Sequence, residues 1–422
     1  MNQIASLGVN IRFGWLTFFG WRPLKSARYR SIPLSGSPSF KIIVILASIG
    51  SLGPFAIDTY LPALPGMVEG LGTTTGMIQW TLAAYLIGIA VFPLFLAPFS
   101  DALGRKPTLY WALFAFVVIS ALCAFAPNIE MLIALRLAQA AAGGTVMTVA
   151  RAVLADLYRG DTLSRAMSYL MLVFTTAPII APLIGGVVLE FGGWRWVFGF
   201  LSLIALVIMS ATLALPETVP ESARRKFSVS EAAQGYLHIA RSRRARGYLF
   251  LTFASSLFFF AMLSGAPFIF IDHFDVTPLQ FSYFFAGISA AALLGNFLNM
   301  RLVLRRGYAR MLRDCAYGVT VLAIAMAAVA MTGVAGVWGV FGVMLWLMAA
   351  YHISAANSTA GLMDQLGQQA GGASAVLALF RFIGGAIGSG LIGVLGDSHP
   401  WTFAVVLGIS AAGMLLSLRL VR

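Results

Sequence analysis

The chain has 422 residues, of which 59% are hydrophobic and 10% are charged, and its mean hydropathy is +0.88. Soluble globular domains carry about 25% charged residues, so this composition excludes a soluble protein and indicates one that crosses a membrane repeatedly. The net charge of +13 is also typical of proteins that bind nucleic acid, and the positions of the cations decide between the two explanations.

Twelve apolar runs follow one another along the chain, and each has the length needed to cross a hydrocarbon core about 30 Å thick. The sequence therefore predicts an all-α membrane protein. The expected spans are residues 41–63, 77–98, 108–126, 131–154, 166–190, 194–214, 247–271, 279–300, 312–332, 336–357, 371–394 and 401–418.

The longest polar break separates six spans from six. The segment after span two, from Ser100 to Lys106, has a degraded counterpart after span eight, from Asn299 to Gly307, as in transporters built from a duplicated unit. The predicted parts are an N-terminal tail at 1–40, a six-helix bundle at 41–215, a cytoplasmic linker at 216–246, a second bundle at 247–418 and a cytoplasmic tail at 419–422.

The cations lie almost entirely on one side of this topology. Of the 28 lysines and arginines, Arg195 alone lies on the opposite side, Arg136 and Arg381 lie deep inside spans, and the other 25 lie in the inner segments or close to the inner ends of spans. Because cytoplasmic loops retain Lys and Arg, we expect both termini in the cytoplasm. The positive charge then needs no nucleic acid to explain it.

No motif for a bound metal or cofactor is present. The two cysteines and four histidines are scattered, without a metal-ligand spacing such as His-Glu-x-x-His, and no Gly-x-x-x-x-Gly-Lys-Ser/Thr signature for ATP binding occurs. We expect no disulfide framework, no metal and no cofactor.

Two charges inside spans lie at matching depth. At 1.5 Å per residue, Asp58 in span one and Arg136 in span four are both about 9 to 10 Å below the outer surface. This permits a salt bridge whose opening would change the proton affinity of the carboxylate, so both are candidates for proton coupling. The alternative is a structural pair that holds the two spans together.

Arg381 lies near the middle of span eleven, roughly 15 Å from its inner end. A cation at that depth is costly without a partner. It could meet an anionic or polar substrate or a carboxylate such as Asp58, or it could be bonded within the bundle to Gln side chains or backbone carbonyls.

The loop after span two combines an acid, a glycine turn and a basic pair: Asp101, Gly104, Arg105 and Lys106. Such a cluster can latch the inner ends of helices in one conformation and release them in another. Positive-inside retention alone would explain Arg105 and Lys106 but not the other two.

These segments resemble motifs of the major facilitator superfamily. The loop after span two resembles the family's signature Gly-x-Leu-x-Asp-Arg-x-Gly-Arg-Lys, which it matches at Asp101, Gly104, Arg105 and Lys106. This sequence departs from the signature at Ala97, Phe99 and Ala102. In span four, Arg136 with Gln139 resembles the family's Arg-x-x-Gln motif. In span five, Ala181-Pro182-Leu183-Ile184-Gly185-Gly186 is similar to the antiporter motif Gly-Pro-x-x-Gly-Gly. We expect Pro182, Gly185 and Gly186 to take part in the conformational change, with static close packing as the alternative.

Further segments narrow the resemblance to the bicyclomycin and chloramphenicol resistance (Bcr/CflA) efflux family: Gly53 to Pro62, Ala150-Arg151-Ala152 with Asp156-Leu157, Gly193-Trp194-Arg195 and Leu215-Pro216-Glu217-Thr218. The resemblance implies two six-helix pseudo-repeats, a monomer in the bacterial inner membrane, and export of drugs in exchange for protons. The residues expected to line the substrate cavity are Phe55, Tyr60, Tyr85, Gln139, Phe259 and Arg381, although aromatic residues in such proteins more often face lipid or other helices.

The sequence thus predicts a proton-coupled exporter of hydrophobic or amphipathic small molecules. A uniporter or symporter of a polar metabolite is the main alternative, which the span-five motif disfavours. An integral-membrane enzyme would need paired carboxylates or histidines near one interface, and none is evident; nothing requires a receptor or scaffold.

Overall fold

The structure is a computed structural model that describes residues 39–96, 99–219, 242–366, 370–396 and 399–421. Within these residues, twelve helical segments are long and apolar enough to cross a membrane, which confirms the predicted all-α class. The predicted N-terminal tail, except for its last two residues, and most of the predicted linker lie outside the described residues.

The helices of the first half are α1 (Phe40–Asp58), the short η2 (Leu61–Ala63), α2 (Leu64–Gly70), α3 (Thr75–Leu96), α4 (Phe99–Leu103), α5 (Arg105–Ala124), α6 (Ile129–Leu157), α7 (Gly160–Gly192) and α8 (Trp194–Thr212). Those of the second half are α10 (Arg243–Pro267), the short π-helix η4 (Phe268–His273), α11 (Pro278–Arg306), α12 (Tyr308–Thr332), α13 (Gly336–Leu366), α14 (Ala370–Leu395) and α15 (Pro400–Val421). The predicted C-terminal tail is therefore helical as far as Val421, because α15 continues beyond the expected end of the last span.

The first span differs from the prediction because its α-helix ends at Asp58, short of the end of the expected run 41–63. Pro62 lacks an N–H group and its ring would collide with the carbonyl four residues earlier, which is that of Asp58. The chain therefore leaves the α-helix after Asp58 and continues as η2 and α2. Asp58 becomes the last residue of α1 rather than an interior one.

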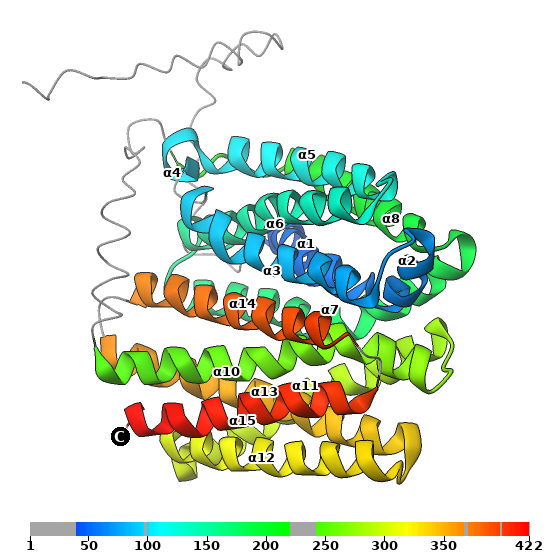
Figure 1. Cartoon of the computed structure of the whole chain (residues 1–422). Helices are drawn as coiled ribbons and strands as arrows, with labels where there is room; N and C mark the ends of the chain where they lie inside the picture. The colour runs from blue at the N-terminus through cyan, green and yellow to red at the C-terminus, as the bar shows by residue number, and fades with distance from the viewer. Residues whose placement is uncertain (1–38, 97–98, 220–241, 367–369, 397–398, 422) are drawn as a thin grey trace, which may run out of the picture. The chain divides into compact units, whose positions relative to one another are not determined.

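The two halves meet along two helix pairs. In Figure 1 α3 lies beside α14, and these two helices pack together, as do α7 and α11. Two hydrogen bonds between described residues join the halves, and both use Gln79 of α3: the Ser264 hydroxyl donates to its Oε1 (3.4 Å) and the Ser389 hydroxyl to its carbonyl oxygen (3.2 Å).

These contacts lie toward the ends of the helices that were predicted to be extracellular. Gln79 is four residues into α3, and at this end a side chain on Gly76 would collide with the backbone of Gly393. Within the described residues, no hydrogen bond or ion pair joins the halves at the opposite, basic end. The halves are therefore closed against each other on the predicted outer side.

Candidate functional site

Arg136 is the most enclosed charge of the described structure. Its side chain is fully buried on α6, and its guanidinium group donates to the carbonyl oxygen of Ala56 through Nη2 (2.9 Å) and to Oε1 of Gln139 through Nη1 (2.6 Å). The rings of Tyr60 and Tyr85 lie 4.3 and 4.2 Å from its central carbon, within the range of cation–π attraction.

This arrangement replaces the salt bridge that the sequence permitted. The last carbonyls of a helix lack partners within the helix, and Ala56 is in the final turn of α1, so Arg136 caps that helix end. A cation at a helix C-terminus also interacts favourably with the helix dipole. No ion pair forms between Arg136 and Asp58 in the described structure, because the guanidinium group is bonded to the backbone of α1 instead.

Gln139 carries the network onward to α5. Its Nε2 donates to the Ser120 hydroxyl (2.7 Å), which in turn donates to the carbonyl of Phe116 (2.6 Å). Gln139 was predicted to line the substrate cavity, but its side chain is fully buried and both ends of its amide are bonded within the first half. It positions Arg136, and its neighbour on α5 was not foreseen from the sequence.

Asp58 lies next to this network without joining it. The side chain is 4% exposed and forms no hydrogen bond or ion pair with any residue that the structure describes. Behind it, α7 approaches so closely that a side chain on Gly185 would collide with the carbonyl oxygen of Thr59. The buried carboxyl group of Asp58 thus lies at the break in span one, where α7, the helix that carries the predicted antiporter motif, packs against the chain.

The predicted cavity residues fall into two groups. Tyr60 and Tyr85 are fully buried against Arg136, so they enclose the guanidinium group. Phe55 and Phe259 are partly exposed, and Phe259 of α10 stacks on Tyr351 of α13 with ring centroids 3.8 Å apart. Arg381 is partly exposed on α14, away from the network of the first half.

The loop at the basic end forms the predicted cluster. Gly104 has φ 107° and ψ 151°, a conformation that glycine adopts at little cost, and it turns the chain into α5. Arg105 then pairs with Asp101 (2.6 Å) and, through Nε, with Asp156 at the end of α6 (2.9 Å). The motif therefore ties α4, α5 and α6 together.

Two further residues complete this cluster. The Glu217 carboxylate accepts the backbone N–H groups of Arg105 (2.9 Å) and Lys106 (3.2 Å) at the N-terminus of α5, where negative charge is stabilised. The Asp156 carboxylate also accepts the Thr218 hydroxyl (3.0 Å). In the sequence, Glu217 and Asp156 stood out only as members of short motifs of the resembled family. Those motifs did not indicate that either residue contacts the loop.

The span-five motif lies where helices approach most closely. Pro182, Gly185 and Gly186 are all buried in α7. A side chain on Gly186 would collide with the Ser282 hydroxyl of α11, in the other half. Gly185 thus contacts the break next to Asp58, and Gly186 contacts α11 of the second half.

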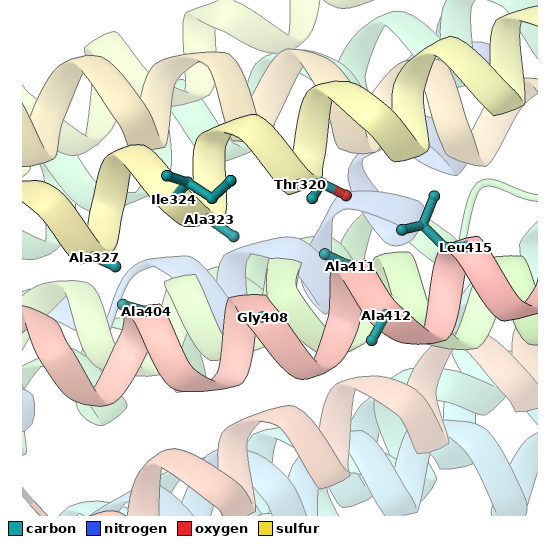
Figure 2. Close-up of a pocket in the computed structure, with 9 residues that line it drawn as sticks. All are labelled: Thr320, Ala323, Ile324, Ala327, Ala404, Gly408, Ala411, Ala412 and Leu415. Atoms are coloured by element: carbon teal, nitrogen blue, oxygen red, sulfur yellow. The ribbon is translucent and has the colours of Figure 1, made fainter.

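A separate hollow of about 340 Å³ lies between α12 and α15. Figure 2 shows its lining, which consists mainly of alanines with one polar residue, Thr320. None of its nine residues is a predicted site residue or belongs to the network around Arg136.

Comparison with known proteins identifies the family. The model of the Major Facilitator Superfamily matches residues 46–389. An uncharacterized MFS-type transporter of Bacillus subtilis, YdgK, is 29% identical over 366 residues, covering 85% of this chain and 90% of that protein. The bicyclomycin resistance protein homolog of Haemophilus influenzae is 28% identical over 355 residues (84% and 89%), and the chloramphenicol resistance protein of Pseudomonas aeruginosa is 29% identical over 369 residues (86% of each).

Solved structures share the fold. The nucleoside transporter NupG has a TM-score of 0.75 at 12% identity, covering 90% of this chain and 99% of that one. A bacterial homolog of the lysosomal transporter Spinster, inward-facing and unoccupied, has a TM-score of 0.68 at 14% identity (92% and 95%). The named relatives support the resemblance to the bicyclomycin and chloramphenicol resistance branch, and the match over most of its length shows that the chain belongs to the major facilitator superfamily of multi-pass membrane transporters.

Proposed function

We propose that this protein exports hydrophobic or amphipathic small molecules, including drugs, in exchange for protons. Two relatives that cover most of the chain are named as resistance proteins, one for bicyclomycin and one for chloramphenicol. A resistance transporter must move its substrate outward, and the halves of this chain are closed on the predicted outer side, ready to receive substrate from within. The protein would act without a cofactor or chemical reaction, as a monomer in the bacterial inner membrane with both termini in the cytoplasm.

The observation that carries proton coupling is the buried carboxyl group of Asp58. It lies at the C-terminal end of α1, where the negative end of the helix dipole disfavours an anion, and no cation among the described residues pairs with it. A buried carboxylate without a partner is costly, so a proton is the simplest counter-charge for it.

The neighbouring helices give a route from proton binding to movement. Because Gly185 contacts Thr59 beside Asp58 and Gly186 contacts α11, α7 links the carboxyl group to the second half. Rocking of the halves changes the packing of α7 and therefore the surroundings of Asp58. One proton that enters across 100 mV supplies about 2.3 kcal/mol to each cycle.

The cluster at the basic end would serve as the latch of this cycle. Its ion pairs between Arg105, Asp101 and Asp156 are partly exposed, and exposed pairs are worth about 0 to 1 kcal/mol each. Pairs of that strength can hold the first half as a unit and still exchange partners when the inner side closes.

The test uses inverted vesicles that carry the protein and have an acidic interior. Addition of a transported drug, such as chloramphenicol as the first probe, is expected to release protons from the interior, which a pH-sensitive dye records. Asp58→Asn is expected to abolish this release while leaving drug exchange down its own gradient. Asp275→Asn is the matched control, since Asp275 is exposed on a loop and has φ 54°, a conformation that Asn also adopts.

The result that contradicts the proposal is drug movement that is unaffected by the pH gradient in the unmodified protein. Such movement would favour a uniporter. Equal proton release by the Asp58→Asn and Asp275→Asn variants would remove Asp58 from the coupling step but would leave antiport itself in place.

A further inference from the structure

The hollow between α12 and α15 opens at the surface of the second half. Its lining is apolar apart from Thr320 (Figure 2). Among the candidate spans of the described residues, that of α12 is the least buried within the protein, and Ile324 in the wall of the hollow is 66% exposed. Because both helices cross the membrane, the hollow faces the hydrocarbon of the bilayer.

The hollow has room for a flexible hydrocarbon chain. A side chain on Gly408, in its wall, would meet no other atom within 4 Å. An apolar cavity of about 150 Å³ holds one benzene molecule, so the 340 Å³ of the hollow accommodate on the order of twelve carbon atoms. An unfilled gap of this kind deprives its lining of van der Waals contacts, and a chain that enters it restores them.

The hollow points toward arginines at the basic end of the bundle. The helix α12 runs away from that end and α15 runs toward it, so Thr320 and Leu415 form the nearer end of the hollow. Arg313 precedes Thr320 by seven residues, and Arg419 follows Leu415 by four. These spacings keep each arginine on the helix face that lines the hollow, roughly 10 and 6 Å beyond its end.

The positive charge at this point exceeds the negative charge. Arg310, Arg313 and Arg419 are exposed, and neither Arg310 nor Arg419 forms an ion pair or hydrogen bond with a residue that the structure describes. The nearest acid to Arg313 is Asp314, 3.8 Å from its Nε, and Asp314 also bonds Arg306 (3.1 Å). Water can satisfy exposed guanidinium groups, so these charges alone indicate no ligand. Their alignment with an apolar hollow indicates a ligand that has a negative head and a hydrocarbon chain.

Two simpler explanations each cover only part of this arrangement. Retention of cations on the cytoplasmic side accounts for arginines at this end of the helices but leaves the hollow unexplained. Small residues at a helix contact allow close approach, yet here they leave a gap between α12 and α15. An anionic lipid accounts for the charge and the gap together.

We propose that α12 and α15 bind one molecule of an anionic phospholipid, with an acyl chain in the hollow and the headgroup phosphate between Arg313 and Arg419. Guanidinium groups bind phosphate through paired hydrogen bonds, and Arg310 adds positive charge one turn further along α12. The bound lipid joins the two helices at the surface of the second half. This inference depends on the membrane location of the family and is independent of the proposed drug export.

The test measures lipid binding to the delipidated protein in detergent by native mass spectrometry. The probes are phosphatidylglycerol and phosphatidylcholine with identical acyl chains, because choline cancels the negative charge of the phosphate. We expect phosphatidylglycerol to bind at least ~10-fold more tightly, since each arginine near an anionic lipid contributes about fivefold. Equal affinity for the two lipids would overturn the proposal. Displacement of the lipid by an equal concentration of glycerol 3-phosphate, which has no acyl chain, would overturn it too, because the site would then bind free phosphate.

Substitutions of the arginines locate the headgroup. Arg313→Gln and Arg419→Gln are each expected to weaken phosphatidylglycerol binding ~5-fold with little change for phosphatidylcholine. Arg419→Lys keeps the charge and should keep the preference. Arg165→Gln is the matched control, because Arg165 is an exposed arginine at the basic end of the first half. Equal loss in all three glutamine variants would show that the headgroup does not lie between Arg313 and Arg419.

Filling the hollow tests the position of the acyl chain. Gly408→Leu places a side chain in open space, so the protein should remain folded while both lipids bind at least ~5-fold more weakly, as overpacking of this kind typically costs. Gly318→Leu is the control, since Gly318 of α12 also has no atom within 4 Å and does not line the hollow.

Thermal unfolding gives a second measurement on the same variants. In detergent alone, the midpoint shows whether each variant is folded. Addition of phosphatidylglycerol should raise the midpoint of the Gly318→Leu variant and leave that of the Gly408→Leu variant unchanged, because only a bound lipid stabilises the folded state. Equal binding and equal stabilisation of the two variants would overturn the placement of the chain in the hollow.

Discussion

Replacement of Arg136 by lysine tests whether this residue acts through its shape or only through its charge. Lysine keeps the positive charge in the buried position, so the electrostatic field at Asp58 is largely preserved. The planar guanidinium group reaches both the Ala56 carbonyl on α1 and the Gln139 amide on α6 while it lies between the rings of Tyr60 and Tyr85. A single ammonium group cannot make all of these contacts.

The structure gives the size of the expected loss. Hydrogen bonds within membrane proteins contribute about 0.6 kcal/mol on average, and charge-assisted ones about 1.5 to 3 kcal/mol. Each cation–π contact adds about 0.5 to 2 kcal/mol. Loss of one hydrogen bond and part of the ring contact should therefore lower the free energy of unfolding by about 2 kcal/mol, which is a fall of ~2–4 °C in the midpoint for a chain of this length.

The assay is thermal unfolding of the detergent-solubilised protein, followed through its tryptophan fluorescence. Gln139→Leu and the double variant complete a cycle, because Arg136 and Gln139 share one hydrogen bond and their effects should not add. Fully additive losses, or a lysine variant as stable as the unmodified protein, would refute the capping role of Arg136. Proton-coupled transport by the lysine variant should fall in parallel, since the cap holds the end of α1 that carries Asp58.

Two further predictions concern the helix contacts. Glu217→Ala removes the carboxylate that caps the start of α5, and we expect the free energy of unfolding to fall by about 1 to 2 kcal/mol, measured by the same thermal method; an unchanged midpoint would contradict the cap. Gly186→Leu places a side chain where Ser282 of α11 lies, so transport in vesicles should fall at least ~10-fold while the protein remains folded. Gly199→Leu is its control, since Gly199 faces open space, and equal activity of these two leucine variants would show that the α7–α11 contact does not limit transport.

The sequence alone was sufficient for the number of spans and for the family, because a hydrocarbon environment imposes a length and an apolar composition on every helix. It also located the residues of the inner loop, since Asp101, Gly104 and Arg105 lie within five positions of one another and one turn brings them together. Local spacing decides such contacts, and local spacing can be read directly.

Contacts between distant segments depended on the tertiary structure. Depth correctly predicted that Arg136 lies near the outer part of span one, but depth cannot tell whether a guanidinium group meets a carboxylate or a backbone carbonyl. The break after Asp58 decided this, because it exposed the carbonyl of Ala56 to Arg136. Pro62 was visible in the sequence, yet its effect on the partner of Arg136 required the packed helices.

The contact of Gly186 on α7 with Ser282 on α11 shows the same limit most clearly. These residues belong to different halves, and the hydropathy of their spans carries no information about which helix faces which. The sequence indicated that Gly185 and Gly186 allow another helix to approach closely. Only the packed bundle decided that Gly185 meets the break next to Asp58 while Gly186 meets α11, because side-chain direction in a bundle is set by how the helices pack against one another.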